Sequence, residues 1–133
     1  PEDEQDCFSD NTHFSHFYDA KGIRNVYLGE YLRADGTKMT GPSLSSLVVV
    51  VDPAADATLK SDLADTEAKI QVMVDRAAKG EHYDQLIAAG NESGNQVVRD
   101  AIAALVKQTG AIEQAAGKLG ISDLNPDNAD HEF

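Results

Sequence analysis

Apolar positions recur at helical spacing through the middle of the chain. Between Asp52 and Gly80 they stand three or four residues apart, which is the spacing of one face of an amphipathic α-helix. These positions are Ala55, Leu59, Leu63, Thr66, Ile70, Val74 and Ala77. The pattern predicts one long helix that ends near Lys79 and Gly80.

A second apolar stripe follows Gly80 at the same spacing, and it is long enough to pack antiparallel against the first helix. Its members are Tyr83, Leu86, Ile87, Val97, Val98, Ala101, Ile102, Leu105, Ile112, Ala116 and Leu119. The segment 90–95 carries two Gly-Asn steps and is either a loop between two helices or a kink in one long helix. We favour the kinked helix, with the Gly-Asn steps packed against a neighbouring helix.

Capping signals divide the region before the long helix. Ser43 precedes an apolar run and predicts the N-cap of a short helix that ends near Val51. The pair Asp52-Pro53 ends that helix, because the residue before proline is pushed out of the helical conformation. The same pair predicts the start of the long helix, with Asp52 as N-cap and Pro53 at the first position.

The first 42 residues look different. They are dense in Gly, Asp, Asn and aromatic residues and show weak periodicity, so we expect a loop-rich region. Residues 22–28 predict a short helical turn within it. The pair Asp35-Gly36 lies between segments 31–33 and 37–39 and predicts the tight turn of a small β-hairpin.

Together these elements predict a mainly α protein. A helical bundle occupies residues 43–120, the loop-rich region 1–42 precedes it, and a turn-like acidic tail follows at 121–133. Aromatic residues make up only 6% of the chain and Trp is absent, so Ala and the aliphatic residues supply most of the core. This composition suits packed helices better than a β-sandwich.

The charge of the chain excludes some partners. Its net charge is -12 and its pI is about 4.5, which argues against a surface for DNA or RNA. The longest apolar run, Leu47 to Val51, is far too short to cross a membrane, and no basic cluster offers a site for anionic lipid. We therefore expect no nucleic-acid partner and no membrane-spanning segment.

The start of the chain adds two expectations. Cys7 is the single cysteine, so we expect a free thiol. The chain opens at Pro1 with neither an initiator Met nor a signal peptide, so we expect a processed or cleaved product of a longer protein.

The segment from Cys7 to Asp19 concentrates side chains that can do chemistry: a thiol, several hydroxyls, carboxylates and two imidazoles. His13 and His16 are three residues apart, so on a helical turn both can face one metal ion, with Asp10 or Asp19 as an oxygen ligand. In the alternative interpretation, residues 10–12 form a turn or helix cap and the histidines lie at the surface. The core anchors would then be Phe8, Phe14 and Phe17. The local sequence favours this alternative.

Other polar residues also have two interpretations. Arg24 offers a planar donor fork either to a carboxylate ligand or to an internal acidic residue, and an internal salt bridge is the preferred interpretation. His82 and His131 are expected to be solvated.

Three motifs, spaced along residues 1–45, carry a family resemblance. They are Cys7-Phe8-Ser9-Asp10-Asn11-Thr12-His13, Gly22-Ile23-Arg24-Asn25-Val26-Tyr27-Leu28-Gly29 and Gly41-Pro42-Ser43-Leu44-Ser45. The chain resembles the imelysin family, in particular the C-terminal half of its iron-regulated protein A type. The similarity continues through 80–84 and the two Gly-Asn steps to the acidic end.

The resemblance implies two helical-bundle domains, a bacterial periplasmic or outer-membrane location and a role in iron uptake. Some members of the family are insulin-cleaving metallopeptidases. The metal motif of the family is H-x-x-E, which lies in the N-terminal half, and this chain lacks it: the fourth residue is His16 after His13, Asp19 after His16 and Gln85 after His82. We therefore expect the N-terminal half of the same protein as a partner.

The resemblance also implies that this half supplies one wall of a site between domains, with iron or zinc as the metal. The ligand-binding candidates are Ser9, Asp10, Asn11, Thr12, Arg24 and Tyr27, and the metal-ligand candidate is His13. Binding of a metal or a metal-bearing ligand is the leading hypothesis. The alternative is part of a zinc-type metallopeptidase whose H-x-x-E motif lies on the missing half, and a third hypothesis is a purely structural half.

Overall fold

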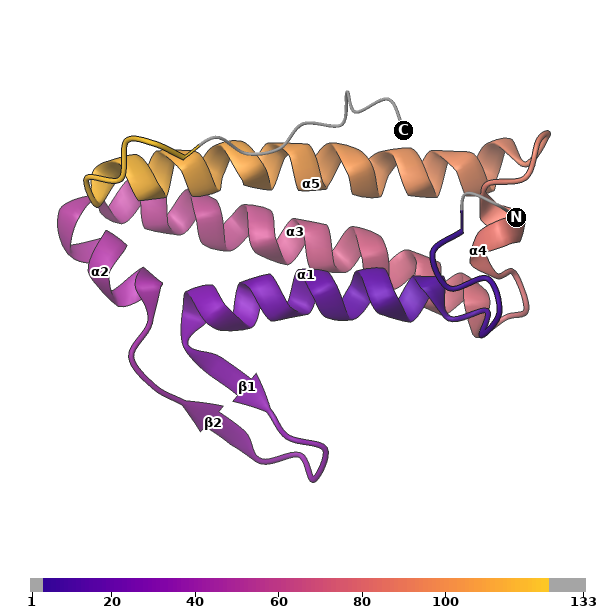
Figure 1. The fold of residues 1–133 in the computed structure, drawn as a ribbon, viewed down its shortest axis with the longest axis horizontal. Helices are drawn as coiled ribbons and strands as arrows, with labels where there is room; N and C mark the ends of the chain where they lie inside the picture. Colours follow the sequence, from indigo (N-terminus) through magenta and orange to yellow (C-terminus); the bar gives the residue numbers. More distant parts are fainter. Residues whose placement is uncertain (1–3, 125–133) are drawn as a thin grey trace.

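The computed structural model describes residues 4–124, and helices dominate this part of the chain (Figure 1). The elements in chain order are α1 (Thr12–Leu28), β1 (Glu30–Leu32), β2 (Lys38–Thr40), α2 (Leu44–Val51), α3 (Pro53–Ala77), α4 (Tyr83–Leu86) and α5 (Glu92–Lys118). The prediction of a mainly α fold with a small hairpin is confirmed.

Helix α3 is the centre of the bundle, because α1 and α5 lie along it on either side (Figure 1). The predicted apolar stripe of this helix is its buried face, and Leu59, Leu63 and Ile70 are each only 1% exposed. The end of α5 meets the start of α3, where Lys118 Nζ lies 2.9 Å from Asp52 Oδ2. The two long helices therefore run antiparallel, as the sequence predicted.

Both predicted helix caps are present. The Ser43 hydroxyl accepts a hydrogen bond from the Ser46 N–H at 3.0 Å. Asp52 Oδ1 accepts from the N–H groups of Ala54 and Ala55 at 3.1 and 3.0 Å, and Pro53 follows it as the first residue of α3. These caps satisfy N–H groups that a helix start leaves without partners.

The expectation of a loop-rich region over residues 1–42 holds only in part, because 17 of these residues form one helix. Helix α1 extends over 17 residues, and the predicted turn at 22–28 is only its last part. Its buried face mixes Thr12 and His13 with apolar side chains, which weakens the periodicity in the sequence. Gly29 ends the helix with φ of 62°, and a Cβ there would come within 2.6 Å of the Pro42 carbonyl oxygen.

The predicted hairpin follows α1 and extends away from the bundle (Figure 1). Strands β1 and β2 are antiparallel, with Tyr31 opposite Met39. Asp35 Oδ1 accepts the Thr37 N–H at 2.8 Å, and Gly36 adopts φ of 83°, as the Asp-Gly pair predicted. The hairpin is exposed at nearly every position.

The continuous kinked helix expected through 90–95 is instead two helices, joined by a loop over residues 87–91, and residues 92–95 form the first turn of α5. Helix α4 ends at Leu86, and Asn91 caps the start of α5 by accepting the Gly94 N–H at 2.9 Å. The Asn95 side chain donates to three carbonyl groups of the turn, those of Leu86, Ala88 and Asn91. The Gly-Asn steps therefore build the connection, because their amides satisfy the carbonyl groups of the turn.

Helix α5 is rotated relative to the predicted stripe. Its buried face consists of small residues and one amide: Gly94, Ala101, Ala104, Gln108, Ala111 and Ala115. Ile102 was predicted in the stripe but is 52% exposed. Small side chains allow α3 and α5 to approach closely, since interhelical distance depends on the side chains at the contact.

Most of the buried apolar residues form two clusters along α3. One contains Tyr27, Val48, Ala55, Leu59, Leu63, Ala111 and Ala115. The other contains Phe17, Ala20, Ile70, Met73, Leu86 and Ala101.

Two remaining expectations concern the ends and the surface. Residues 121–124 of the predicted tail adopt neither helix nor strand, and positions 125–133 lie outside the described residues. Within residues 4–124, no helix is both long and apolar enough to cross a membrane.

Candidate functional site

Three carboxylates from distant parts of the sequence meet at the α4 end of the bundle. Glu4 comes from the N-terminal segment, Asp10 from the turn before α1 and Asp84 from α4, and each has an oxygen within 4.8 Å of the others. Figure 1 shows the N-terminal segment beside α4. We call these three residues the carboxylate cluster.

Thr12 holds the N-terminal segment in place. Its hydroxyl donates to Glu4 Oε1 at 2.8 Å and accepts the Asp6 N–H at 3.0 Å, and the residue is 0% exposed. Asp10, two residues earlier, has φ of 54°, a left-handed conformation that few residues other than Gly, Asn and Asp adopt. This turn brings the Asp10 carboxylate to the cluster.

His13 lies in the first turn of α1 next to the carboxylate cluster. It is only 4% exposed, and its Nδ1 is buried without a hydrogen-bond partner. Burial lowers the pKa of His13 below its ordinary value, and His82 lowers it further, while Asp10 and Glu4 raise it in part. The ring is therefore held in its neutral form, which has a nitrogen lone pair free to bind a metal ion.

His82 joins the same group of residues. Its ring lies 5.8 Å from that of His13, and its Nδ1 lies 2.9 Å from Asp10 Oδ2. That distance suits an ion pair, although the atoms lack the alignment of a hydrogen bond. The expectation that His82 is solvated holds only in part, because its side chain is 35% exposed while its Nδ1 is buried beside Asp10. His131 lies outside the described residues.

The donor set fits a metal ion. Carboxylate oxygens are ligands for hard cations, and a neutral imidazole extends the choice to iron and zinc. Carboxylates this close to one another also repel, and a cation between them would remove that repulsion. Glu4, Asp10 and Asp84 bring ligand oxygens within 4.8 Å of one another, and His13 lies beside them, near enough to Asp10 and Glu4 for their charges to affect its pKa.

Ser9 and Asn11, the other candidates in this turn, are exposed. The Ser9 hydroxyl donates to the Asp6 carbonyl at 3.3 Å, and Asn11 is the N-cap residue of α1 without a side-chain capping bond. His16 lies three residues after His13, and its ring is 5.5 Å from that of Tyr83.

The competing interpretation of this segment holds only in part. Phe17 is buried, as it required, but Phe8 and Phe14 are exposed. His13 is buried and not at the surface. The phenylalanines therefore do not act together as core anchors.

Arg24 and Tyr27 lie at the other end of α1 from the carboxylate cluster. Tyr27 follows Thr12 by fifteen residues, which is about 22 Å along a helix. Arg24 Nη1 lies 2.8 Å from Glu67 Oε2, which is the preferred internal salt bridge. The structure therefore does not bring the six ligand-binding candidates to one place.

Tyr27 belongs to a buried polar group around Asp56. Asp56 Oδ1 accepts hydrogen bonds from the Tyr27 hydroxyl at 2.9 Å and the Ser45 hydroxyl at 2.7 Å, and Oδ2 lies 2.8 Å from Lys60 Nζ. Burial, together with the Asp56 carboxylate, raises the pKa of Tyr27. This group joins α1, α2 and α3, so its role is structural.

The sequence analysis did not single out Glu4, His82 or Asp84 as site residues. Only the fold brings residues 4 and 84 together. A signal for His82 and Asp84 was nevertheless present, because residues 80–84 belong to the sequence that carried the family resemblance.

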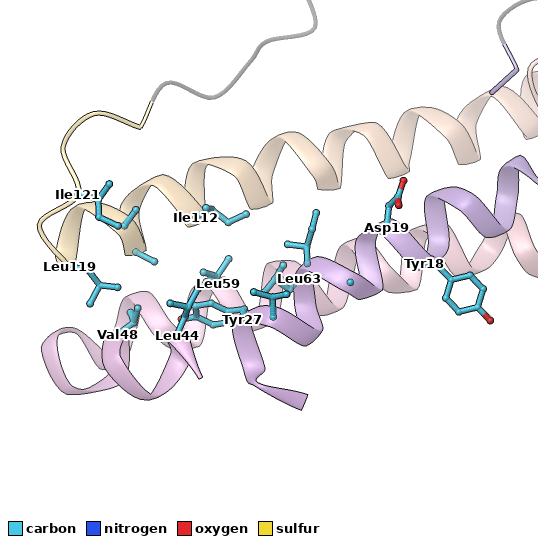
Figure 2. A pocket seen from close by; sticks show the side chains of 15 residues that line it. Tyr18, Asp19, Tyr27, Leu44, Val48, Leu59, Leu63, Ile112, Leu119 and Ile121 are labelled. Atoms are coloured by element: carbon cyan, nitrogen blue, oxygen red, sulfur yellow. The ribbon is translucent and has the colours of Figure 1, made fainter. Parts of the chain in front are cut away.

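An apolar groove lies elsewhere on the bundle, between α1 and α5 and above α3 (Figure 2). Its volume is about 540 Å³. Its walls come from Tyr18, Asp19, Gly22, Ile23, Val26 and Tyr27 of α1, Leu44 and Val48 of α2, Leu59 and Leu63 of α3, Ile112, Ala115 and Ala116 of α5, and Leu119 and Ile121 after it. Figure 2 shows Asp19 extending from α1 towards α5.

Residues 1–112 match the family model Peptidase_M75, which is described as imelysin. The match includes the carboxylate cluster and α1 to α4, and it ends within α5. A search of curated proteins finds no match.

Proposed function

Because this chain belongs to the imelysin family, we propose that it binds a metal ion, or a small ligand that carries one, at the carboxylate cluster. The observation that carries the proposal is His13 Nδ1, a buried atom without a hydrogen-bond partner. Buried polar atoms are nearly always paired, and one left unpaired costs about 1–3 kcal/mol. A metal bound by this nitrogen would remove that cost.

Iron is the metal that the resemblance to iron-regulated protein A favours, and zinc is the alternative. Glu4, Asp10 and Asp84 would supply oxygen ligands, and a nitrogen ligand from His13 would require its ring to approach the three carboxylates more closely than in this structure. Both metals accept this mixture of ligands. The net charge of -12 also favours a cation over an anion as the ligand.

The proposal extends to the role of the whole protein. The motifs at 7–13 and 22–29 support a part in iron uptake at the bacterial periplasm or outer membrane. The N-terminal half of such a protein would supply the H-x-x-E motif that this chain lacks. The cluster would then lie at one wall of a larger site.

Metal binding by the full 133-residue chain tests the proposal. We expect calorimetric titration with Fe²⁺ under anaerobic conditions, or with Zn²⁺, to show saturable binding. His13→Ala and Asp10→Ala should each weaken the affinity at least about tenfold, as is typical when a group of a metal site is removed. Circular dichroism should show unchanged helix content.

Two variants serve as matched controls. Asp75→Ala removes an exposed carboxylate of α3 whose partner is Gln71, and His16→Ala removes the other imidazole of α1. Both should keep the affinity of the parent chain. Unchanged affinity in His13→Ala and Asp10→Ala would remove these residues from the site.

A metallopeptidase is the second candidate, supported by the name of the matching family model. The chain would supply substrate contacts or a further ligand to a metal held by H-x-x-E on the other half. Cleavage of a protein substrate by the reassembled halves, abolished by a chelator, would support it. Lack of turnover in a metal-loaded preparation of both halves would contradict it.

A further inference from the structure

We propose that a cation bound at the carboxylate cluster fastens residues 4–10 to α4, so that this N-terminal segment is held firmly when the ion is bound and loosely when it is not. The inference rests on the proposed function, because it assigns a conformational effect to the ion that the cluster is proposed to bind. Its basis is the difference between the contacts that the segment makes with α1 and those that it makes with α4.

Hydrogen bonds attach the segment to the start of α1. The Thr12 hydroxyl donates to Glu4 Oε1 at 2.8 Å and accepts the Asp6 N–H at 3.0 Å. The Ser15 hydroxyl donates to the Asp6 carboxylate. The Asp6 carbonyl oxygen in turn accepts the Asp10 N–H at 2.9 Å and closes the turn before the helix. None of these bonds involves α4, so they hold the segment on α1 with or without an ion.

The polar contacts between the segment and α4 are mostly repulsive. Among residues 4–124, one ion pair links the segment to the start of α4, that of Asp10 Oδ2 with His82 Nδ1 at 2.9 Å. The Glu4 and Asp10 carboxylates each have an oxygen within 4.8 Å of the Asp84 carboxylate. Like charges at this distance repel each other. The segment is therefore held weakly against α4 unless a cation lies among the three carboxylates.

Helix α4 is the fixed side of this contact. Leu86 is 0% exposed and belongs to the apolar cluster that includes Phe17 and Ile70. The segment contributes no apolar side chain to either core cluster, and its Cys7 and Phe8 are both exposed. Segments with few buried apolar contacts open at the lowest cost in free energy. The segment should therefore move away from α4 when the ion leaves, while α4 stays in place.

A cation reverses the balance of charge at this contact. Carboxylate oxygens bind hard cations, and here they come from both sides, Glu4 and Asp10 from the segment and Asp84 from α4. The buried Nδ1 of His13, which has no hydrogen-bond partner, is a second and independent sign of a ligand beside the cluster. An ion that binds the docked arrangement and not the open one stabilises the docked arrangement by mass action.

The single cysteine provides the readout. Cys7 is exposed and lies in the segment, so a nitroxide spin label can be attached to it in the full 133-residue chain without any substitution. Electron paramagnetic resonance then measures the rotational correlation time of the label. Zn²⁺ is diamagnetic and should lengthen that time, and a chelator should restore it. At a Zn²⁺ concentration of about 100 times the dissociation constant, the open arrangement should become about a hundredfold rarer.

Asp84→Asn tests the role of α4. It removes one ligand, so Zn²⁺ should affect the label less. It also removes one like charge, so without the ion the label should move more slowly than in the metal-free parent chain. The matched control is Asp75→Asn, which removes an exposed carboxylate of α3 and should behave as the parent does. A label moved to the hairpin, by Cys7→Ser together with Thr37→Cys, should not respond to Zn²⁺.

Calorimetric titration of the same samples separates this inference from the proposed function. Saturable binding of Zn²⁺ with no change in the mobility of the label would overturn the inference and leave the proposed function standing. The absence of saturable binding of both Zn²⁺ and Fe²⁺ would overturn both. A label that moves faster in metal-free Asp84→Asn than in the metal-free parent would also contradict the inference, because Asp84 would then attract the segment.

Discussion

Asp56 is the residue at which three helices are tied together. It is 4% exposed, and it receives hydrogen bonds from Tyr27 of α1, Ser45 of α2 and Lys60 of its own helix. Burial raises the pKa of Asp56, but these three hydrogen bonds outweigh it and hold the pKa below its ordinary value. Lys60 lowers the pKa most, followed by the Ser45 and Tyr27 hydroxyls, and because the Lys60 side chain is 43% exposed, solvent screens part of its charge.

This environment predicts a defined dependence of stability on pH. The folded chain binds a proton at Asp56 less readily than the unfolded chain does, so the group stabilises the fold fully above the unfolded pKa near 3.8. That contribution is lost as the pH falls through the lower folded pKa. Asp56→Asn should lower the free energy of unfolding by about 2 kcal/mol at pH 7 and flatten its decline in acid.

Urea denaturation at a series of pH values measures both effects. Asp75→Asn is the control, since Asp75 is exposed, and it should change the unfolding free energy by less than about 0.5 kcal/mol. Curves for the parent chain and Asp56→Asn that stay parallel down to acid pH would show that Asp56 is not the titrating group.

The sequence identified some of the residues at the carboxylate cluster, but it did not predict which side chains surround them. His13 and Asp10 were named as candidates, and both lie at the cluster. Their neighbours Glu4 and Asp84 are 80 residues apart in the sequence, and no local pattern links them. Arg24 was expected to form an internal salt bridge, but the identity of its partner, Glu67, depends on how α1 packs on α3.

At the scale of elements, two glycines of α5 differ in the space around them. A Cβ at Gly94 would come within 2.7 Å of the Leu86 carbonyl oxygen and 2.8 Å of its Cα, so the turn between α4 and α5 needs a residue without a side chain. At Gly110, in the middle of α5, a Cβ would meet nothing within 4 Å. The same substitution should therefore have opposite effects at the two positions.

We expect Gly94→Ala to lower the free energy of unfolding by about 1–3 kcal/mol, because backbone atoms must move to admit the methyl group. Gly110→Ala should raise it by about 1 kcal/mol, because alanine is the better helix former. Chemical denaturation of both variants checks the pair. A stabilising Gly94→Ala would mean that α4 is not held against the start of α5.

The prediction of elements from sequence succeeded where one face is apolar and failed where it is mixed. The stripe of α3 and its cap at Asp52 are as predicted. Helix α1 was missed because buried Thr12 and His13 interrupt its apolar face and Gly22 lowers its propensity. The buried face of α5 consists largely of alanine. The sequence analysis assigned the larger Ile102 to the buried face, although this residue is exposed.

On the scale of the whole molecule, the hairpin lies at the edge of the bundle and contacts it mainly through α1. Its strands pair with each other, Glu30 faces Thr40 across the register, and almost all of its side chains are exposed. Replacing residues 31–39 by Asn-Gly would close the same pair of residues with a two-residue turn. We expect the melting temperature to change by no more than about 3 °C, because the substitution removes little buried surface.

Thermal denaturation followed by circular dichroism tests this expectation. A drop of more than about 10 °C would contradict it and would show that the hairpin contributes to the bundle core.

The division of the core into two clusters along α3 has a consequence for hydrogen exchange. Each cluster takes side chains from α1, α3 and α5, but from opposite ends of these helices. Amide protons around Leu59 and those around Ile70 should therefore exchange through separate local openings, each with its own free energy. A metal ion bound near His13 should slow exchange in the Ile70 half and leave the Leu59 half unchanged. One long helix would thus carry two regions whose fluctuations respond differently to the same ligand.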